Sequence, residues 1–96
     1  MEIEKKLEGK KLTVSPVGRL DTINAPELEA ALKYDGVAEL VFDLSRLDYI
    51  SSAGLRVLMA AQKQMMKLGS MTISGAKPMV KEVFDITGFS DIFTLV

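Results

Sequence analysis

The residues that could carry chemistry in this chain are few, and two adjacent serines, Ser51 and Ser52, stand out among them. The sequence contains no histidine and no cysteine, so the usual general base of serine hydrolases and any thiolate nucleophile are missing. A nucleophile elbow also needs glycine two residues before its serine, but Tyr49 and Ile50 occupy those positions. The serines are therefore not predicted to act as hydrolytic nucleophiles.

Other catalytic and ligand-binding patterns are no better supported. Ser74 and Lys77 have the three-residue spacing of a serine and lysine dyad, but the companion motifs of such enzymes do not occur. No Gly-rich loop for nucleotide phosphates is present. The acids Asp43, Asp48 and Asp85 lack the spacing of a calcium or magnesium loop, so we expect solvated carboxylates at the ends of elements. The sequence thus predicts no enzyme, no metal site and no cofactor.

The composition is that of a folded domain without a strong electrostatic field. Of the 96 residues, 48% are hydrophobic and 26% are charged, and the formal net charge is −1. A chain this close to neutral is not expected to bind nucleic acid or an anionic membrane. Its apolar runs fall far short of the roughly 20 residues of a membrane helix, and Met1–Lys6 lacks the apolar core of a signal peptide. With no cysteine either, the sequence predicts a cytoplasmic protein.

Turn and cap residues divide the chain into segments with strand or helix patterns. Alternating residues on either side of Gly9 predict an opening hairpin, and Asn24 followed by Pro26 predicts a capped helix. Helices that alternate with strands predict an α/β fold with a mostly parallel or mixed sheet. The expected elements are strands Ile3–Leu7 and Leu12–Val17, helix Ala25–Lys33, strand Leu40–Leu44, helix Ser52–Leu68, strand Met71–Ser74, helix Pro78–Thr87, and a final strand or extended tail, Ile92–Val96.

The long helix Ser52–Leu68 has two stripes that differ in character. Beside its core face, Leu55, Met59 and Met66 form a flanking stripe almost in line with Ser52. Methionine suits adaptable binding surfaces because its side chain repacks easily. The flank either binds a partner or widens the core contact, and the residues alone favour neither. The expected core face consists of Gly54, Val57, Leu58, Ala61, Met65 and Leu68.

The two serines stand at the start of this helix, where unpaired backbone N–H groups favour either a capping hydroxyl or a phosphate. From the residues alone, a cap is the simpler interpretation. A phosphate would add about −1.5 to −2 charges at neutral pH. A partner fitted to the unmodified surface would then face a desolvated anion.

Three stretches of the chain resemble STAS domains of the bacterial anti-sigma factor antagonist type. They are Gly18–Asp21 followed by Ala25, the segment Leu44–Leu55 around the two serines, and Gly75–Phe89. The resemblance implies a single STAS domain over residues 1–96. It also implies a mixed sheet with an opening hairpin, followed by alternating helices and strands, with the helices packed on the sheet.

The same resemblance implies a regulator without catalytic activity. Its unphosphorylated form would bind an anti-sigma factor serine kinase and release a sigma factor; phosphorylation at Ser52 would end binding, and a phosphatase would restore it. Ser51 stands where many members have aspartate, which makes it a second candidate for modification. The free protein is expected to be a monomer and to keep its fold when phosphorylated. The expected partner-binding residues are Asp21, Ser51, Ala53, Gly54, Leu55, Met59 and Met66.

Two other functions compete with this one. The chain could be a STAS-like structural subunit of a transporter-associated or stress-signalling complex, in which the serine only caps the helix. It could also be an enzyme that uses Ser52 directly, although no base is identifiable in the sequence. Phosphate incorporation separates the first alternative from the switch, and hydrolytic turnover would reveal the second.

Overall fold

In the computed structural model, which describes residues 1–96, five strands and three α-helices follow one another along the chain. The elements are β1 (Glu2–Glu8), β2 (Lys11–Leu20), α1 (Ala25–Ala31), β3 (Glu39–Asp43), β4 (Leu47–Ile50), α2 (Ser52–Leu68), β5 (Ser70–Ser74), α3 (Pro78–Thr87) and a short 3₁₀ turn, Phe89–Asp91. None of the helices is long and apolar enough to cross a membrane.

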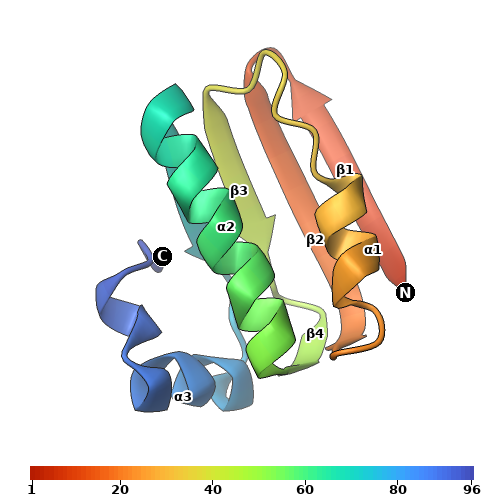
Figure 1. The fold of residues 1–96 in the computed structure, drawn as a ribbon, viewed down its shortest axis with the longest axis vertical. Helices are drawn as coiled ribbons and strands as arrows, with labels where there is room; N and C mark the ends of the chain where they lie inside the picture. The colour runs from red at the N-terminus through yellow and green to blue at the C-terminus, as the bar shows by residue number, and fades with distance from the viewer.

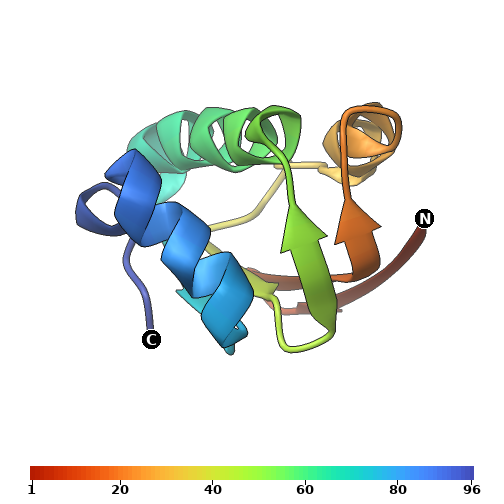
Figure 2. The same cartoon turned by 90° about the horizontal axis from the view of Figure 1, so that it is seen from below.

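The strands form one mixed sheet in the order β1, β2, β3, β5, with β4 paired to the far end of β2 (Figure 1). Only β1 and β2 are antiparallel, joined by a turn in which Gly9 has a φ of 62°; the other pairs are parallel. Helices α1 and α2 lie side by side over one face of the sheet (Figure 2), and α3 lies at the lower end of the molecule as drawn in Figure 1. This arrangement confirms the predicted mixed-sheet α/β fold.

A single apolar cluster lies between the sheet and the helices. It contains 22 buried residues, among them Phe42 of β3, Leu58 of α2 and Phe84 of α3, none of which has measurable exposure. The opposite face of the sheet carries no helix (Figure 2). Polar side chains such as Glu4, Thr13 and Asp43 line a hollow on the sheet. There Arg46 Nη2 lies 2.6 Å from Glu4 Oε2, and this hydrogen bond and the arginine's charge lower the pKa of Glu4.

The structure contains one strand that the sequence did not predict. Strand β4 has only four residues and pairs with Gly18–Leu20 of β2 past an irregularity in register. Its outer residues Leu47 and Ile50 are buried while the two between them are exposed, so it lacks the alternation that marks a strand in sequence. A contact with a segment about thirty residues earlier thus decides its conformation.

Other predicted details also differ from the structure: β2 continues to Leu20 and does not end at Val17. Helix α1 ends at Ala31 rather than Lys33, because Leu32 takes an extended conformation and turns into the core. The segment Ile92–Val96, expected as a final strand or an extended tail, is not a strand: Ile92 and Phe93 form a turn and a bend, and only Leu95 makes a bridge, to Ile73. Leu68 is 46% exposed although it was assigned to the core face, because the buried stripe of α2 ends at Met65.

The start of α2 lies directly on the ends of β2 and β4. A side chain at Gly54 would place its Cβ 2.7 Å from Leu20 Cγ and 2.9 Å from Ile50 Cγ1, well inside contact distance. Because Leu20 and Ile50 are themselves buried, they have little room to move away. Only glycine allows the helix to approach the strands this closely.

Candidate functional site

The two serines at the start of α2 have different environments. Ser51 is the N-cap: its backbone is extended, with φ −94° and ψ 173°, and its Oγ accepts a hydrogen bond from Gly54 N at 3.2 Å. Ser52 is the first residue of the helix, its side chain is exposed, and its hydroxyl makes no hydrogen bond within the protein. The cap therefore occupies Ser51 and leaves the Ser52 hydroxyl free on the surface.

Asp21 lies at the end of β2 and organises the turn into α1. Its Oδ1 accepts hydrogen bonds from the backbone N–H groups of Ile23 and Asn24, both at 3.0 Å. Asn24 returns the contact, because its Oδ1 accepts from Asp21 N at 2.8 Å and its Nδ2 donates to Arg19 O. Asn24 precedes α1 as predicted, but its side chain does not cap the helix, since its oxygen already bonds to Asp21.

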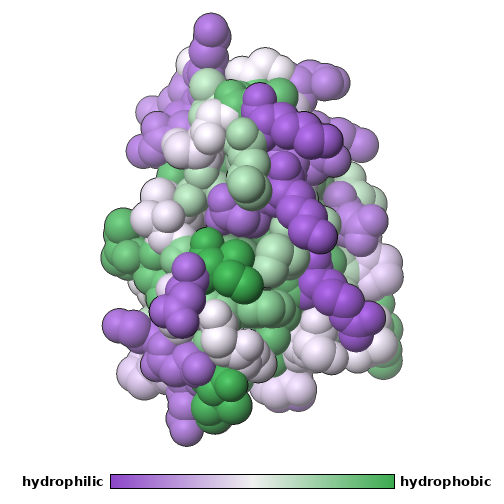
Figure 3. All heavy atoms as spheres, turned by 60° about the vertical axis from the view of Figure 1, so that its left-hand side comes forward, coloured by the Kyte–Doolittle hydropathy of each residue, from purple (hydrophilic) through white to green (hydrophobic).

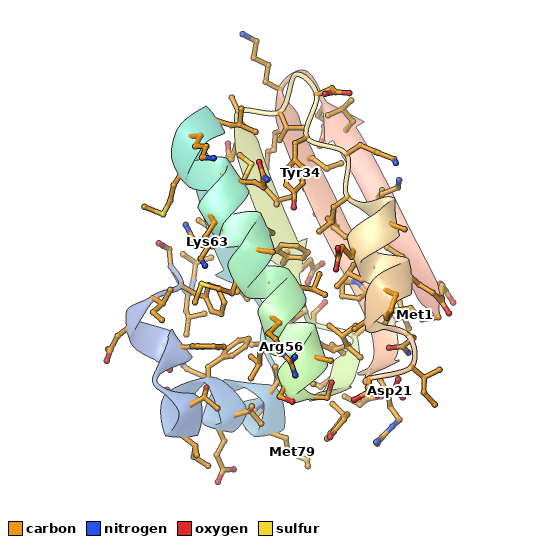
Figure 4. The ribbon with its side chains drawn as sticks, in the orientation of Figure 1. Met1, Asp21, Tyr34, Arg56, Lys63 and Met79 are labelled. Atoms are coloured by element: carbon orange, nitrogen blue, oxygen red, sulfur yellow. The ribbon has the colours of Figure 1, made fainter.

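Asp21 and Ser52 come to the same end of the molecule. Ser51 N donates a hydrogen bond to Leu20 O at 2.9 Å. Asp21 directly follows Leu20, and Ser52 directly follows Ser51, so this bond brings the backbones of the two candidates together. Figure 4 shows Asp21 and Arg56 at the end of the molecule where α2 begins. An acidic side chain and a free hydroxyl thus share one small surface.

The space beside these residues is a shallow hollow between α1 and α2. Thr22 and Glu29 line it from one side, and Ala53 and Arg56 from the other. Its volume is about 250 Å³, and no hollow on the molecule exceeds about 260 Å³. Pockets for small molecules usually occupy roughly 300 to 1,000 Å³. The site is therefore better suited to a protein surface than to a small ligand.

Two exposed apolar side chains that the sequence analysis missed lie at this end. Ile23 is 87% exposed in the turn that Asp21 organises, and Met79 is 71% exposed in the first turn of α3. Figure 4 shows Met79 below the start of α2. Nearby on the sheet ends, the guanidinium of Arg19 covers Tyr49, with Cζ 4.2 Å from the ring centroid. An isoleucine at the tip of a turn, where polar residues are usual, was the available signal.

The residues of the expected flanking stripe, Leu55, Met59 and Met66, differ widely in exposure. Leu55 is only 4% exposed and Gly54 is buried, so neither presents a surface to a partner. Met59 is half-buried against the core, whereas Met66 is 75% exposed. Leu55 belongs to the apolar core cluster near the start of α2, whereas Met66 lies in the last turn, just past the end of the buried stripe at Met65.

An apolar strip nevertheless remains on this side of the molecule. Figure 3 shows hydrophobic side chains down the middle of the face that brings the C-terminal segment forward, with hydrophilic side chains beside them. The exposed apolar residues of α2 and of the C-terminal segment include Met66 and Ile92, the latter 47% exposed. This face is a second candidate for contact with another protein.

The structure brings no catalytic group to the serines. Lys77 Nζ lies 2.5 Å from Asp48 Oδ1, so the lysine is engaged in an ion pair and is not aimed at Ser74. No three acidic side chains lie close enough together to hold a metal ion. What the site offers is a free hydroxyl, a carboxylate and apolar side chains.

Comparison with known proteins identifies relatives over nearly the whole chain. The family model described as the STAS domain matches residues 2–96. A Bordetella bronchiseptica protein named as an anti-sigma factor antagonist, BtrV, is 46% identical over 80 residues, covering 79% of this chain and 69% of that protein. A Listeria monocytogenes anti-sigma-B factor antagonist is 33% identical over 82 residues, covering 81% and 72%.

Among solved structures, an anti-sigma factor antagonist from Mycobacterium paratuberculosis superposes with a TM-score of 0.87 at 27% identity, covering 98% of this chain and 83% of that one. The antagonist SpoIIAA of Bacillus, at 15% identity, shares the fold. Its unphosphorylated form gives a TM-score of 0.85, with 99% and 88% coverage, and its phosphorylated form gives 0.76, with 99% and 91%.

The different roles of the two serines give a stability test. Ser51→Ala removes the cap and is expected to lower the free energy of unfolding by about 1 kcal/mol, within the usual range of 0.5 to 2. Ser52→Ala removes a hydroxyl without a partner and should change it by less than about 0.5 kcal/mol. Urea denaturation of both variants measures the difference. Equal losses in the two variants would contradict the assignment of the cap.

Proposed function

This chain belongs to the STAS domain family, and we propose that it acts as an anti-sigma factor antagonist whose binding is switched off by phosphorylation of Ser52. Members of this kind are regulators rather than enzymes. The observation that carries the proposal is the free, exposed hydroxyl of Ser52 at the start of α2, beside a serine that already serves as the cap. The partner is an anti-sigma factor serine kinase, and its capture releases a sigma factor.

In the unmodified protein, the end of the molecule around Ser52 forms the docking surface. Ile23 and Met79 are the side chains on it with the most apolar area to bury, and each could contribute a few kcal/mol if a partner covered it fully. Asp21 and its hydrogen-bonded turn hold Ile23 in place, so little conformational entropy is lost when the partner binds. Ala53 lies in the hollow beside them and permits close approach.

Phosphorylation acts on this surface and not on the fold. The Ser52 hydroxyl gives up no hydrogen bond when it is esterified, and the added anion lies at the positive end of the α2 dipole. In the complex, however, the same anion would have to lose its water and lie near the carboxylate of Asp21. An ion without a partner in an interface costs several kcal/mol, which is enough to dissociate a typical complex.

Phosphosite mapping tests the identity of the switch. After incubation with the cognate kinase and ATP, we expect mass spectrometry to find one phosphate, on Ser52. Ser52→Ala should abolish the modification while binding to the kinase persists, and Ser51→Ala should remain a substrate. Stoichiometric phosphate on Ser52→Ala would refute the assignment. The absence of any phosphate on the unaltered protein would favour a structural subunit in which the serines only shape the helix.

The position of the docking surface is tested with a pair of methionines of nearly equal exposure. Met79→Glu, at the Ser52 end, is expected to weaken kinase binding by roughly tenfold or more, because it places a charge in the buried centre of the interface. Ile23→Glu should act in the same way. Met66→Glu, on the far turn of α2, is the control and should change the dissociation constant less than about threefold. The dissociation constants are measured by isothermal titration calorimetry. A large increase for Met66→Glu alone would contradict this position and indicate that the kinase binds the flank of α2.

A further inference from the structure

We propose that Arg56 binds the phosphate group on Ser52 and holds it against the first turn of α2. The inference rests on the proposed function, since it concerns the phosphorylated form. In the unmodified protein Arg56 Nε donates to the backbone oxygen of Ser52 at 3.4 Å, so the guanidinium already turns back toward the start of the helix. Figure 4 shows this side chain pointing toward that end.

The spacing and chemistry of the pair favour a direct contact. Residues four apart on a helix are neighbours on one face, and Ser52 and Arg56 have this separation. A guanidinium presents its N–H groups in a planar fork that matches two phosphate oxygens. The 3.4 Å bond uses only Nε, and Arg56 takes part in none of the ion pairs of the structure. Its terminal N–H groups are therefore available.

The other charged groups around Ser52 leave Arg56 as the cation best placed for this role. Lys77 of α3 is paired with Asp48 of β4, and Arg19 of β2 is stacked on a tyrosine ring. From the turn before α1, Asp21 would repel the phosphate. From α1, Glu29 lines the same hollow as Arg56 without forming an ion pair with it.

The contact determines the charge and conformation of the modified site. The second ionisation of phosphoserine has a pKa near 6, so a free phosphate is a mixture of two charge states close to neutral pH. A bound guanidinium favours the dianion and lowers this pKa, whereas Asp21 alone would raise it. Arg56 thus increases the fraction of dianionic phosphate at neutral pH and fixes the orientation of the group. The departing partner then meets a phosphate of fixed orientation, whose charge Arg56 offsets only in part.

The test uses protein with phosphoserine encoded at position 52 during translation, so that no kinase is required. The phosphate pKa is measured by ³¹P NMR titration in otherwise unaltered protein, Arg56→Gln, Arg56→Lys and Lys63→Gln. Arg56→Gln is expected to raise the pKa by roughly 0.3 to 1 unit. Arg56→Lys should recover part of that difference, because lysine retains the charge without the fork.

Lys63→Gln is the matched control, since it removes the same charge from the same exposed side of α2, seven residues beyond Arg56. Its effect should stay within about 0.1 unit, because Lys63 lies eleven residues beyond Ser52, about 16 Å along the helix, which is roughly twice the screening length of physiological salt. Equal phosphate pKa values in Arg56→Gln and Lys63→Gln would overturn the inference. That outcome is independent of the proposed function, which fails instead if the kinase does not modify Ser52 in the unaltered protein.

Discussion

The N-terminus of α2 packs on the ends of β2 and β4 with no side chain between them, because Gly54 occupies the point of contact. A hydrogen bond from Ser51 N to Leu20 O joins the start of the helix to β2, and a second, from Gly54 N to Ser51 Oγ, caps the helix. The same strand end continues into Asp21 and its turn. A displacement of α2 at this point would therefore separate Ser52 from Asp21, and the close approach of helix and strand defines the surface that a partner meets.

In the proposed phosphorylation switch the two serines have separate roles: Ser51 caps α2, and Ser52 is the residue that is modified. Aspartate is as good an N-cap as serine. Serine keeps the capping hydrogen bond and removes one negative charge next to Ser52. A phosphate on Ser52 would consequently meet fewer like charges within α2, and Arg56, four residues on, would balance it in part. The charge that matters to a partner then arises almost entirely from the modification.

Local rules in the sequence were sufficient for the long elements. Helix α2 begins at Ser52 and ends at Leu68 as predicted, because a capping serine and Gly69 mark its limits. Strand β4 was missed because only its pairing with β2 makes four residues a strand. The flanking stripe was partly misjudged because periodicity does not reveal that neighbouring segments cover Leu55 and leave Met66 open. Ile23 escaped notice for a similar reason: its exposure follows from the Asp21 turn and not from its type.

The account's central claim is that a phosphate on Ser52 breaks the complex and leaves the fold intact. The most direct measurement is the dissociation constant for the anti-sigma factor kinase, with and without phosphoserine encoded at position 52, alongside far-UV circular dichroism of both proteins. We predict a loss of affinity of about 100-fold or more, with identical spectra, since the partner would have to desolvate a phosphate that Arg56 neutralises only in part, at a cost of several kcal/mol. Equal affinities, or a loss of affinity accompanied by loss of helix, would contradict the account.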